Sequence, residues 1–186
     1  MSVNLSKGQK VNLSKEAAGL KEVMIGLGWD PQRKIFSPDI DCDASAIYCT
    51  NGKYAGVVYY VDRTAYSGAI YHHGDNLTGA GKGDDEQVTV KLTDLPSDVD
   101  RIVFVVNIYA AQQRKQDFGM VRNAFIRIVD SSCNKELCRY DLSDNYDGKT
   151  AMIFGELYKK DNEWKFAAVG EGTTDNSISE LCRRYK

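Results

Sequence analysis

The sequence lacks any long hydrophobic run. Its longest strongly apolar stretch is Ile102–Val106, whereas a membrane-spanning helix needs roughly 18 or more consecutive apolar residues. The N-terminal stretch MSVNLSKGQK contains no apolar segment that could act as a secretion signal. We therefore expect a cytoplasmic protein with no direct membrane insertion.

The sequence also lacks a strong excess of charge of either sign. Its 24 Lys and Arg residues against 26 Asp and Glu residues give a formal net charge of −2, so no overall field attracts nucleic acid or anionic lipid. A chain of 186 residues with 42% hydrophobic residues is long enough to bury a full core. We expect one domain over residues 1–186 and no nucleic-acid partner.

Soft metal ligands are few and poorly spaced. The five cysteines include no CxxC pair, and their odd number does not suggest a disulfide framework. Cys133 and Cys138 flank a predicted turn and could pair across it, but free thiols suit a cytosolic protein better. His72 and His73 are the only two histidines, and neighbours in a strand point to opposite faces. A zinc site is therefore disfavoured.

Short β-rich runs separated by turn residues fill most of the chain. We expect strands at residues 23–27, 44–49, 56–61, 69–72, 87–92, 101–108, 124–129, 136–140, 151–158 and 164–169. Helices are expected only at 110–116 and 177–184, where Ser177 precedes Glu180 by three residues as in a capping box. This pattern predicts a mainly β fold, a two-sheet β-sandwich with short peripheral helices.

A short duplication occupies the N-terminus. The sequence VNLSK occurs at residues 3–7 and again at residues 11–15, with Gly8 between the copies. Each copy alternates apolar and polar residues, which is the period of a half-buried strand. We expect the two copies to form adjoining strands.

The acidic residues gather in two segments. In the first, Asp39, Asp41 and Asp43 alternate with other residues, so their carboxylates project from one side of an extended chain and repel one another unless a cation lies between them. The second, residues 74–86, reads GDNLTGAGKGDDE and is rich in glycine and oxygen donors. The second segment contributes the candidate ligands Asp75, Asn76, Asp84, Asp85 and Glu86.

Calcium suits these segments because it takes six to eight oxygen ligands, whereas magnesium usually keeps several waters. Neither segment is an EF-hand. Ala44 stands where the loop glycine belongs, and Leu77 and Gly79 replace oxygen ligands in the second segment. The alternative reading is a pair of solvated acidic turns that bind their own backbone.

Several long motifs resemble the TerD family of tellurite-resistance and calcium-binding stress proteins. They are LSKG at residues 5–8, VNLSKE at 11–16, GLGWD at 26–30, DIDCDASA at 39–46, HGDNLTGAGKGDDE at 73–86, FGMVRNAFIRIVD at 118–130 and FGELY at 154–158. The resemblance spans essentially the whole chain. It departs from the family at Cys42, where leucine is common, and in the tyrosine-rich region 49–72.

The resemblance implies a β-sandwich that binds calcium ions, two or more in number. It draws the ligands from Asp30, from Asp41 and Asp43, and from the stretch Asp75–Glu86. It further implies a role in resistance to tellurite and other chemical stress, without enzymatic chemistry. Protein partners are expected, including membrane-associated components of the same stress system, through which the protein would reach the inner face of the membrane.

Two other functions stay open at this point. A constitutive structural protein would hold its calcium permanently, whereas a sensor would exchange it. A hydrolase could use Asp84 and Asp85 as acid and base, although the sequence has no GxSxG motif and the loop lacks the apolar surroundings that raise one carboxyl pKa.

Two further features bear on binding. Arg122 and Asn123 precede an expected core strand and could anchor the acidic segments by charge-assisted hydrogen bonds, with Arg122 the stronger candidate. Six tyrosines crowd one stretch and suggest a partner surface, although tyrosine is equally common in strands. They are Tyr48, Tyr54, Tyr59, Tyr60, Tyr66 and Tyr71.

Overall fold

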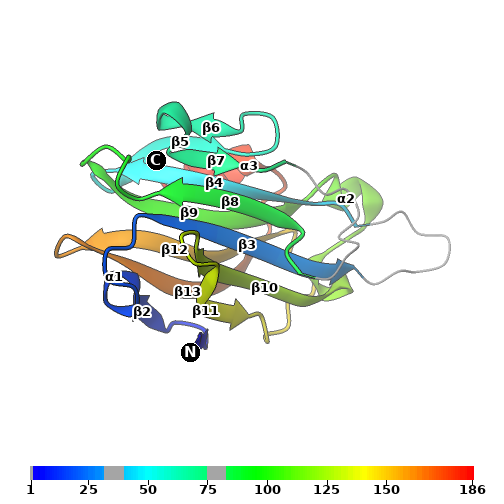
Figure 1. Ribbon diagram of the computed structural model, residues 1–186. Helices are drawn as coiled ribbons and strands as arrows, with labels where there is room; N and C mark the ends of the chain where they lie inside the picture. Colours follow the sequence, from blue (N-terminus) through cyan, green and yellow to red (C-terminus); the bar gives the residue numbers. More distant parts are fainter. Residues whose placement is uncertain (1, 32–39, 75–82) are drawn as a thin grey trace.

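The computed structural model describes residues 2–31, 40–74 and 83–186, which form two β-sheets packed face to face (Figure 1). Sheet A has seven strands in the order β1-β11-β10-β3-β8-β7-β6, and sheet B has six in the order β2-β13-β12-β9-β4-β5. The predicted two-sheet β-sandwich with short peripheral helices is confirmed.

The strands of sheet A are β1 (Val3–Leu5), β3 (Glu22–Pro31), β6 (Thr64–Ala65), β7 (Ile70–His72), β8 (Glu86–Lys91), β10 (Val121–Asp130) and β11 (Lys135–Asp141). Those of sheet B are β2 (Lys10–Asn12), β4 (Cys42–Thr50), β5 (Lys53–Val58), β9 (Val99–Ile108), β12 (Ala151–Lys160) and β13 (Glu163–Thr173). The helices are α1 (Leu13–Glu16), α2 (Ala111–Arg114) and α3 (Ile178–Arg183), with 3₁₀ turns at Tyr66–Gly68 and Phe118–Met120.

The core lies between the sheets because alternate residues of each strand turn inward. In β8, Val88 and Val90 are fully buried while their neighbours are partly exposed. Phe104, Phe154 and Phe166 fill the centre from sheet B and are fully buried. Burying each such side chain contributes about 1.5–3 kcal/mol.

The outer face of sheet B carries a second, smaller apolar cluster. Val103, Val105 and Ile47 pack there against Leu181 of α3. This explains why β9 reads as an almost continuous apolar run, since both of its faces are covered. Helix α3 begins as predicted, because the Ser177 hydroxyl oxygen accepts a hydrogen bond from the Glu180 backbone N–H at 3.2 Å.

The prediction that the VNLSK copies form adjoining strands is wrong. Strand β1 pairs in parallel with β11 of sheet A, whereas β2 pairs antiparallel with β13 of sheet B. Gly8, at φ +82°, turns the chain between the two sheets and its N–H donates to the Ala168 carbonyl. In the second copy, the Asn12 side chain accepts a hydrogen bond from the Lys15 backbone N–H and so caps helix α1, which follows the short strand β2.

Other sequence predictions differ in detail. The strand expected at 56–61 ends at Val58, and α1, β6 and both 3₁₀ turns were not expected. All five cysteines are free thiols, so the conceivable Cys133–Cys138 disulfide is absent. Within the described ranges, no helix has both the length and the apolar character needed to cross a membrane.

Candidate functional site

The end of β3 and the residues preceding β8 lie side by side at one end of the sandwich (Figure 1). The two strands pair antiparallel, with Leu27 opposite Glu86, and the Asp85 N–H donates to the Leu27 carbonyl at 2.8 Å. This pairing brings Asp30, Asp84, Asp85 and Glu86 to the same end. Asp39, Asp75 and Asn76 lie outside the described residues.

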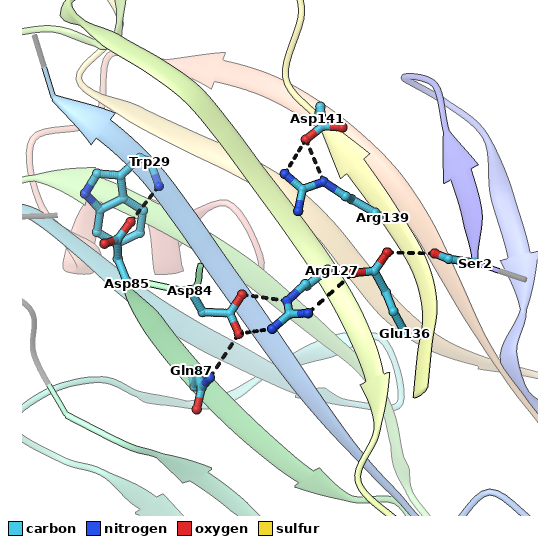
Figure 2. A network of polar contacts seen from close by, with 9 residues as sticks. All are labelled: Ser2, Trp29, Asp84, Asp85, Gln87, Arg127, Glu136, Arg139 and Asp141. Carbon is cyan, nitrogen blue, oxygen red and sulfur yellow. Dashed lines mark hydrogen bonds and ion pairs between the residues drawn. The ribbon is translucent and has the colours of Figure 1, made fainter. Parts of the chain in front are cut away.

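Asp84 is held by Arg127 on the outer face of sheet A (Figure 2). The Arg127 Nε donates to one carboxylate oxygen at 2.7 Å and Nη2 donates to the other at 2.9 Å, which is a bidentate pair. The Gln87 side-chain amide donates to the same carboxylate at 2.9 Å. The hydrogen bonds to Asp84 and its negative charge raise the pKa of Arg127 above its ordinary value. The charge of Asp84 is therefore already matched by a cation of the protein.

The chain of contacts continues across the sheet. Arg127 Nη1 donates to Glu136 at 3.4 Å, and Ser2 donates its hydroxyl to the other oxygen of Glu136 at 2.7 Å (Figure 2). Strands β8, β10 and β11 and the residue before β1 are thus joined by one polar network.

Asp85 and Asp30 are neighbouring carboxylates at the end of β3. Asp85 accepts a hydrogen bond from the Trp29 backbone N–H at 2.7 Å, and Asp30 accepts one from the Asn123 amide at 2.8 Å. Burial raises the pKa of Asp85 above its ordinary value of 3.8, and the negative charges of Asp30 and Asp84 raise it further. The Trp29 hydrogen bond opposes this shift without cancelling it.

Glu86 points the other way, into the space between the sheets. Its carboxylate accepts from the Ala44 N–H at 2.9 Å and lies 3.2 Å from Nε2 of His72, and both side chains are almost fully buried. The Gly74 N–H donates to Nδ1 of His72 at 3.1 Å, which places the ring proton on Nε2, where Glu86 and the Ala44 carbonyl accept it. Glu86 and His72 therefore tie sheet A to β4 of sheet B.

Asp43 lies on the outer face of the other sheet, sheet B. It stands in β4 opposite Asn107 of β9, is 7% exposed, and lines a hollow on the outer face of sheet B. The backbone carbonyl of Asp41 accepts a hydrogen bond from Tyr109 N–H at 2.8 Å. The predicted ligands that the structure describes are thus spread over both outer faces and the interior, and only Asp30 and Asp85 remain as neighbouring carboxylates at the end of β3.

The donor chemistry fits a hard cation better than a soft one. Burial, followed by the charges of Asp43, Asp41, Glu86 and Asp85, raises the pKa of the Cys42 thiol well above its ordinary value, so that this thiol stays protonated and is a poor zinc ligand. Carboxylate and carbonyl oxygens are what calcium prefers. Among residues 2–31, 40–74 and 83–186, no three His, Cys, Asp or Glu side chains are grouped to hold a metal ion.

Sequence reasoning missed the two residues that hold Asp84 and Glu86. Arg127 lies 43 positions from Asp84 in the chain, and His72 looked like one half of a weak zinc motif. The anchoring of Asp30 comes from Asn123, whereas Arg122 donates to the Gly119 carbonyl at 2.8 Å. An arginine flanked by buried Ile126 and Ile128 was the available signal, because a strand directs such a residue to the opposite face.

The six clustered tyrosines do not share one surface. Tyr48 and Tyr66 pack against the main core with ring centroids 5.2 Å apart, and Tyr54 packs against the smaller cluster. Tyr60 and Tyr71 are exposed but lie apart. Tyr60 lines a hollow beside β4 and β9 of sheet B, whereas Tyr71 lies in β7 of sheet A. A partner surface formed by the whole stretch is therefore not supported.

Comparison with known proteins decides the family. The model of the TerD domain matches residues 1–185. The chain belongs to the TerD family. It is 48% identical over 198 residues to the stress response protein SCP2 of Bacillus subtilis (strain 168), covering 100% of both chains. It is also 48% identical over 189 residues to the tellurium resistance protein TerD of Serratia marcescens, covering 100% of this chain and 97% of the relative.

The fold of this TerD-family protein also matches a solved structure. A crystal structure described as a homologue of telluride resistance protein (TerD), SCO6318 from Streptomyces coelicolor A3(2), superposes with a TM-score of 0.72. The match covers 90% of this chain and 99% of the other at 23% identity, and it supports the sandwich alone. The names of the matched family members describe resistance and stress response.

Proposed function

We propose that this protein is a non-enzymatic, cytoplasmic stress-response protein that binds calcium at the end of β3, and that calcium orders the acidic loops for contact with protein partners. The proposed ligands are Asp30 and Asp85, together with oxygens from the segments 32–39 and 75–82. Those segments contain the predicted ligands Asp39, Asp75 and Asn76.

The observation that carries this proposal is the pair Asp30 and Asp85. Burial raises the pKa of Asp85, and the negative charge of Asp30 raises it further, so the two carboxylates oppose each other's ionisation. A bound cation would remove this repulsion, and its binding energy would stabilise the folded state. Calcium would supply a local positive charge that links the two acidic segments.

A hydrolase is less well supported by the same contacts. Asp84 is bound on both oxygens by Arg127, which leaves it poorly placed to transfer a proton with Asp85. The relatives' printed names describe resistance and stress response.

The test is thermal unfolding of the full chain in EDTA, in calcium and in magnesium. Calcium at a hundredfold excess over its dissociation constant should stabilise the wild-type protein by about 2.7 kcal/mol, and magnesium should do less. Asp30→Asn and Asp85→Asn keep a hydrogen-bond acceptor but should lose most of the calcium gain. If calcium stabilised both variants as much as it stabilises the wild-type protein, the proposed ligands would be wrong.

The matched control is Asp161→Asn. Asp161 lies in the turn between β12 and β13, at the opposite end of the sandwich from the start of β8 (Figure 1), and its side chain is 74% exposed. Its φ of +57° suits asparagine. This variant changes the net charge by the same amount and should keep the full calcium gain.

The calcium affinity distinguishes a sensor, near 10⁻⁷ to 10⁻⁵ M, from a permanent structural site, which binds more tightly.

A further inference from the structure

A hollow of about 370 Å³ lies on the outer face of sheet A, where β3, β8 and β7 are neighbouring strands (Figure 1). Its size is at the lower end of the range for small-molecule pockets, ~300–1,000 Å³. The hollow is separate from the proposed calcium site, because Glu22 begins β3 whereas Asp30 lies near the other end of that strand. The lining residues are Glu22, Gly68, Tyr71, His73, Thr89 and Lys91.

Two opposite charges line this hollow without neutralising each other. Glu22 and Lys91 are directly opposite in the pairing of β3 with β8, a position in which opposite charges normally attract across the strands. Both residues are partly buried. Neither forms an ion pair or a side-chain hydrogen bond with any residue in the part of the chain that the structure describes. The carboxylate and the ammonium group are therefore both available to a ligand.

The aromatic side of the hollow is held in place by the protein itself. Arg63 donates from Nε to the His72 carbonyl at 3.0 Å and from Nη2 to the Tyr71 hydroxyl at 3.0 Å. The rings of Tyr71 and His73 meet edge to face with centroids 5.0 Å apart, and Nε2 of His73 lies 2.8 Å from the Thr89 hydroxyl. Tyr71 is still 37% exposed. A ligand can pack against these rings without first ordering them, which lowers the cost of binding.

An aromatic α-amino acid carries the three groups that this lining complements. Its carboxylate suits the ammonium group of Lys91, and its own ammonium group suits the carboxylate of Glu22. Its ring can pack against the two aromatic residues of the lining, since aromatic pairs favour centroid distances of about 4.5–7 Å. In a protein chain, peptide bonds remove both charges from every internal residue. The free amino acid therefore matches the lining better than a protein segment does.

We propose that this hollow binds a free α-amino acid with an aromatic side chain. Lys91 binds the carboxylate, Glu22 binds the ammonium group, and Tyr71 and His73 pack against the ring. This binding does not depend on calcium at Asp30 and is a function additional to it.

The test uses the full chain, labelled with nitrogen-15, in EDTA, so that its outcome is independent of the calcium site. The probe is L-phenylalanine, which should produce saturable amide shifts confined to β7, β8 and the start of β3. Phenethylamine lacks the carboxylate, 3-phenylpropanoate lacks the ammonium group, and glycine lacks the ring. Each of the three should bind at least about threefold more weakly than phenylalanine.

Two charge variants assign the two ends of the ligand. Glu22→Gln should weaken phenylalanine binding at least about threefold but should not weaken binding of 3-phenylpropanoate, which has no ammonium group. Lys91→Gln should weaken phenylalanine binding by a similar factor but should not weaken binding of phenethylamine. The controls for net charge are Asp161→Asn and Lys160→Gln, at the exposed β12–β13 turn and the exposed end of β12. Both controls should bind phenylalanine as the wild type does.

A third variant tests the aromatic side. Tyr71→Ala should weaken phenylalanine binding at least about threefold, whereas Tyr109→Ala, at a residue that is 50% exposed and lies outside this lining, should not. Four results would overturn the proposal. They are no saturable shift with phenylalanine, binding of phenethylamine, 3-phenylpropanoate or glycine as tight as that of phenylalanine, wild-type affinity in either charge variant, and wild-type affinity in Tyr71→Ala.

Discussion

Gly26 of β3 lies directly beneath the carboxylate of Asp84, so close that a Cβ at Gly26 would meet the carboxylate atoms at 2.3 Å. Asp84 precedes β8, Arg127 is in β10, and β3 runs between them. The ion pair can therefore form only by passing over a residue without a side chain. The passage of the Asp84 side chain over β3 thus requires glycine at position 26.

Replacing Gly26 with alanine should break the Asp84–Arg127 pair. The added methyl group displaces a carboxylate that is 2% exposed, and overpacking of this kind costs about 1–3 kcal/mol. Urea unfolding of wild type, Gly26→Ala, Asp84→Ala and the double variant would measure the coupling. Because the clash needs the carboxylate, Gly26→Ala should cost less in the Asp84→Ala background, and equal costs in the two backgrounds would contradict this view.

The Glu86–His72 contact predicts a second coupling, between the two sheets. Glu86 accepts from the Ala44 N–H and lies beside the ring N–H of His72, and leaving such buried donors unsatisfied costs about 1–3 kcal/mol each. Glu86→Ala should therefore lower the free energy of unfolding by at least that amount. His72→Ala should also destabilise, and the double variant should cost much less than the sum of the two. Additive losses in chemical unfolding would show that the pair does not act as a unit.

Local patterns predicted the elements of this fold well. Alternation in Val88–Val90 places β8 with one face in the core, and the spacing of Ser177 and Glu180 identifies the start of α3. These signals act within one or two turns of chain, where backbone geometry alone relates the residues.

The pairing between distant strands could not be predicted in the same way. The identical VNLSK copies join different sheets because their partners, β11 and β13, differ. Asp41 and Asp43 were expected to share one side of an extended chain, and the face on which Asp43 lies is set by the pairing of β4 with β9. The candidate site was predicted as one cluster of carboxylates, whereas sheet register separates Asp43, Asp84 and Glu86.

Helix α3 provides a prediction about the outer face of sheet B. Ser177→Ala removes the hydroxyl that accepts from Glu180 N–H, and loss of such a cap costs about 1 kcal/mol. Since Leu181 of α3 covers Val103 and Val105 of β9, hydrogen exchange of the β9 amides should also accelerate. Ser179→Ala, at an exposed position of the same helix, is the control and should change neither quantity.

Neutralising Asp84 and neutralising Asp85 should change the free energy of unfolding in opposite directions. Burial and the charges of Asp30 and Asp84 raise the pKa of Asp85, so the folded protein binds more protons than the unfolded chain between the ordinary pKa of 3.8 and the raised value. The free energy of unfolding therefore falls as pH rises through that window. Ionised Asp85 then destabilises the metal-free fold at neutral pH.

Asp85→Asn should accordingly stabilise the protein at neutral pH in EDTA, and this advantage should vanish as the pH falls towards 3.8, the ordinary value for this carboxyl group. Asp84→Asn should destabilise it at neutral pH, because Arg127 loses the anion that binds both of its donors. Urea unfolding at several pH values would measure both effects. Destabilisation by Asp85→Asn at neutral pH would mean that the hydrogen bond from Trp29 outweighs the repulsion, so that Asp30 and Asp85 would have no need of a cation between them.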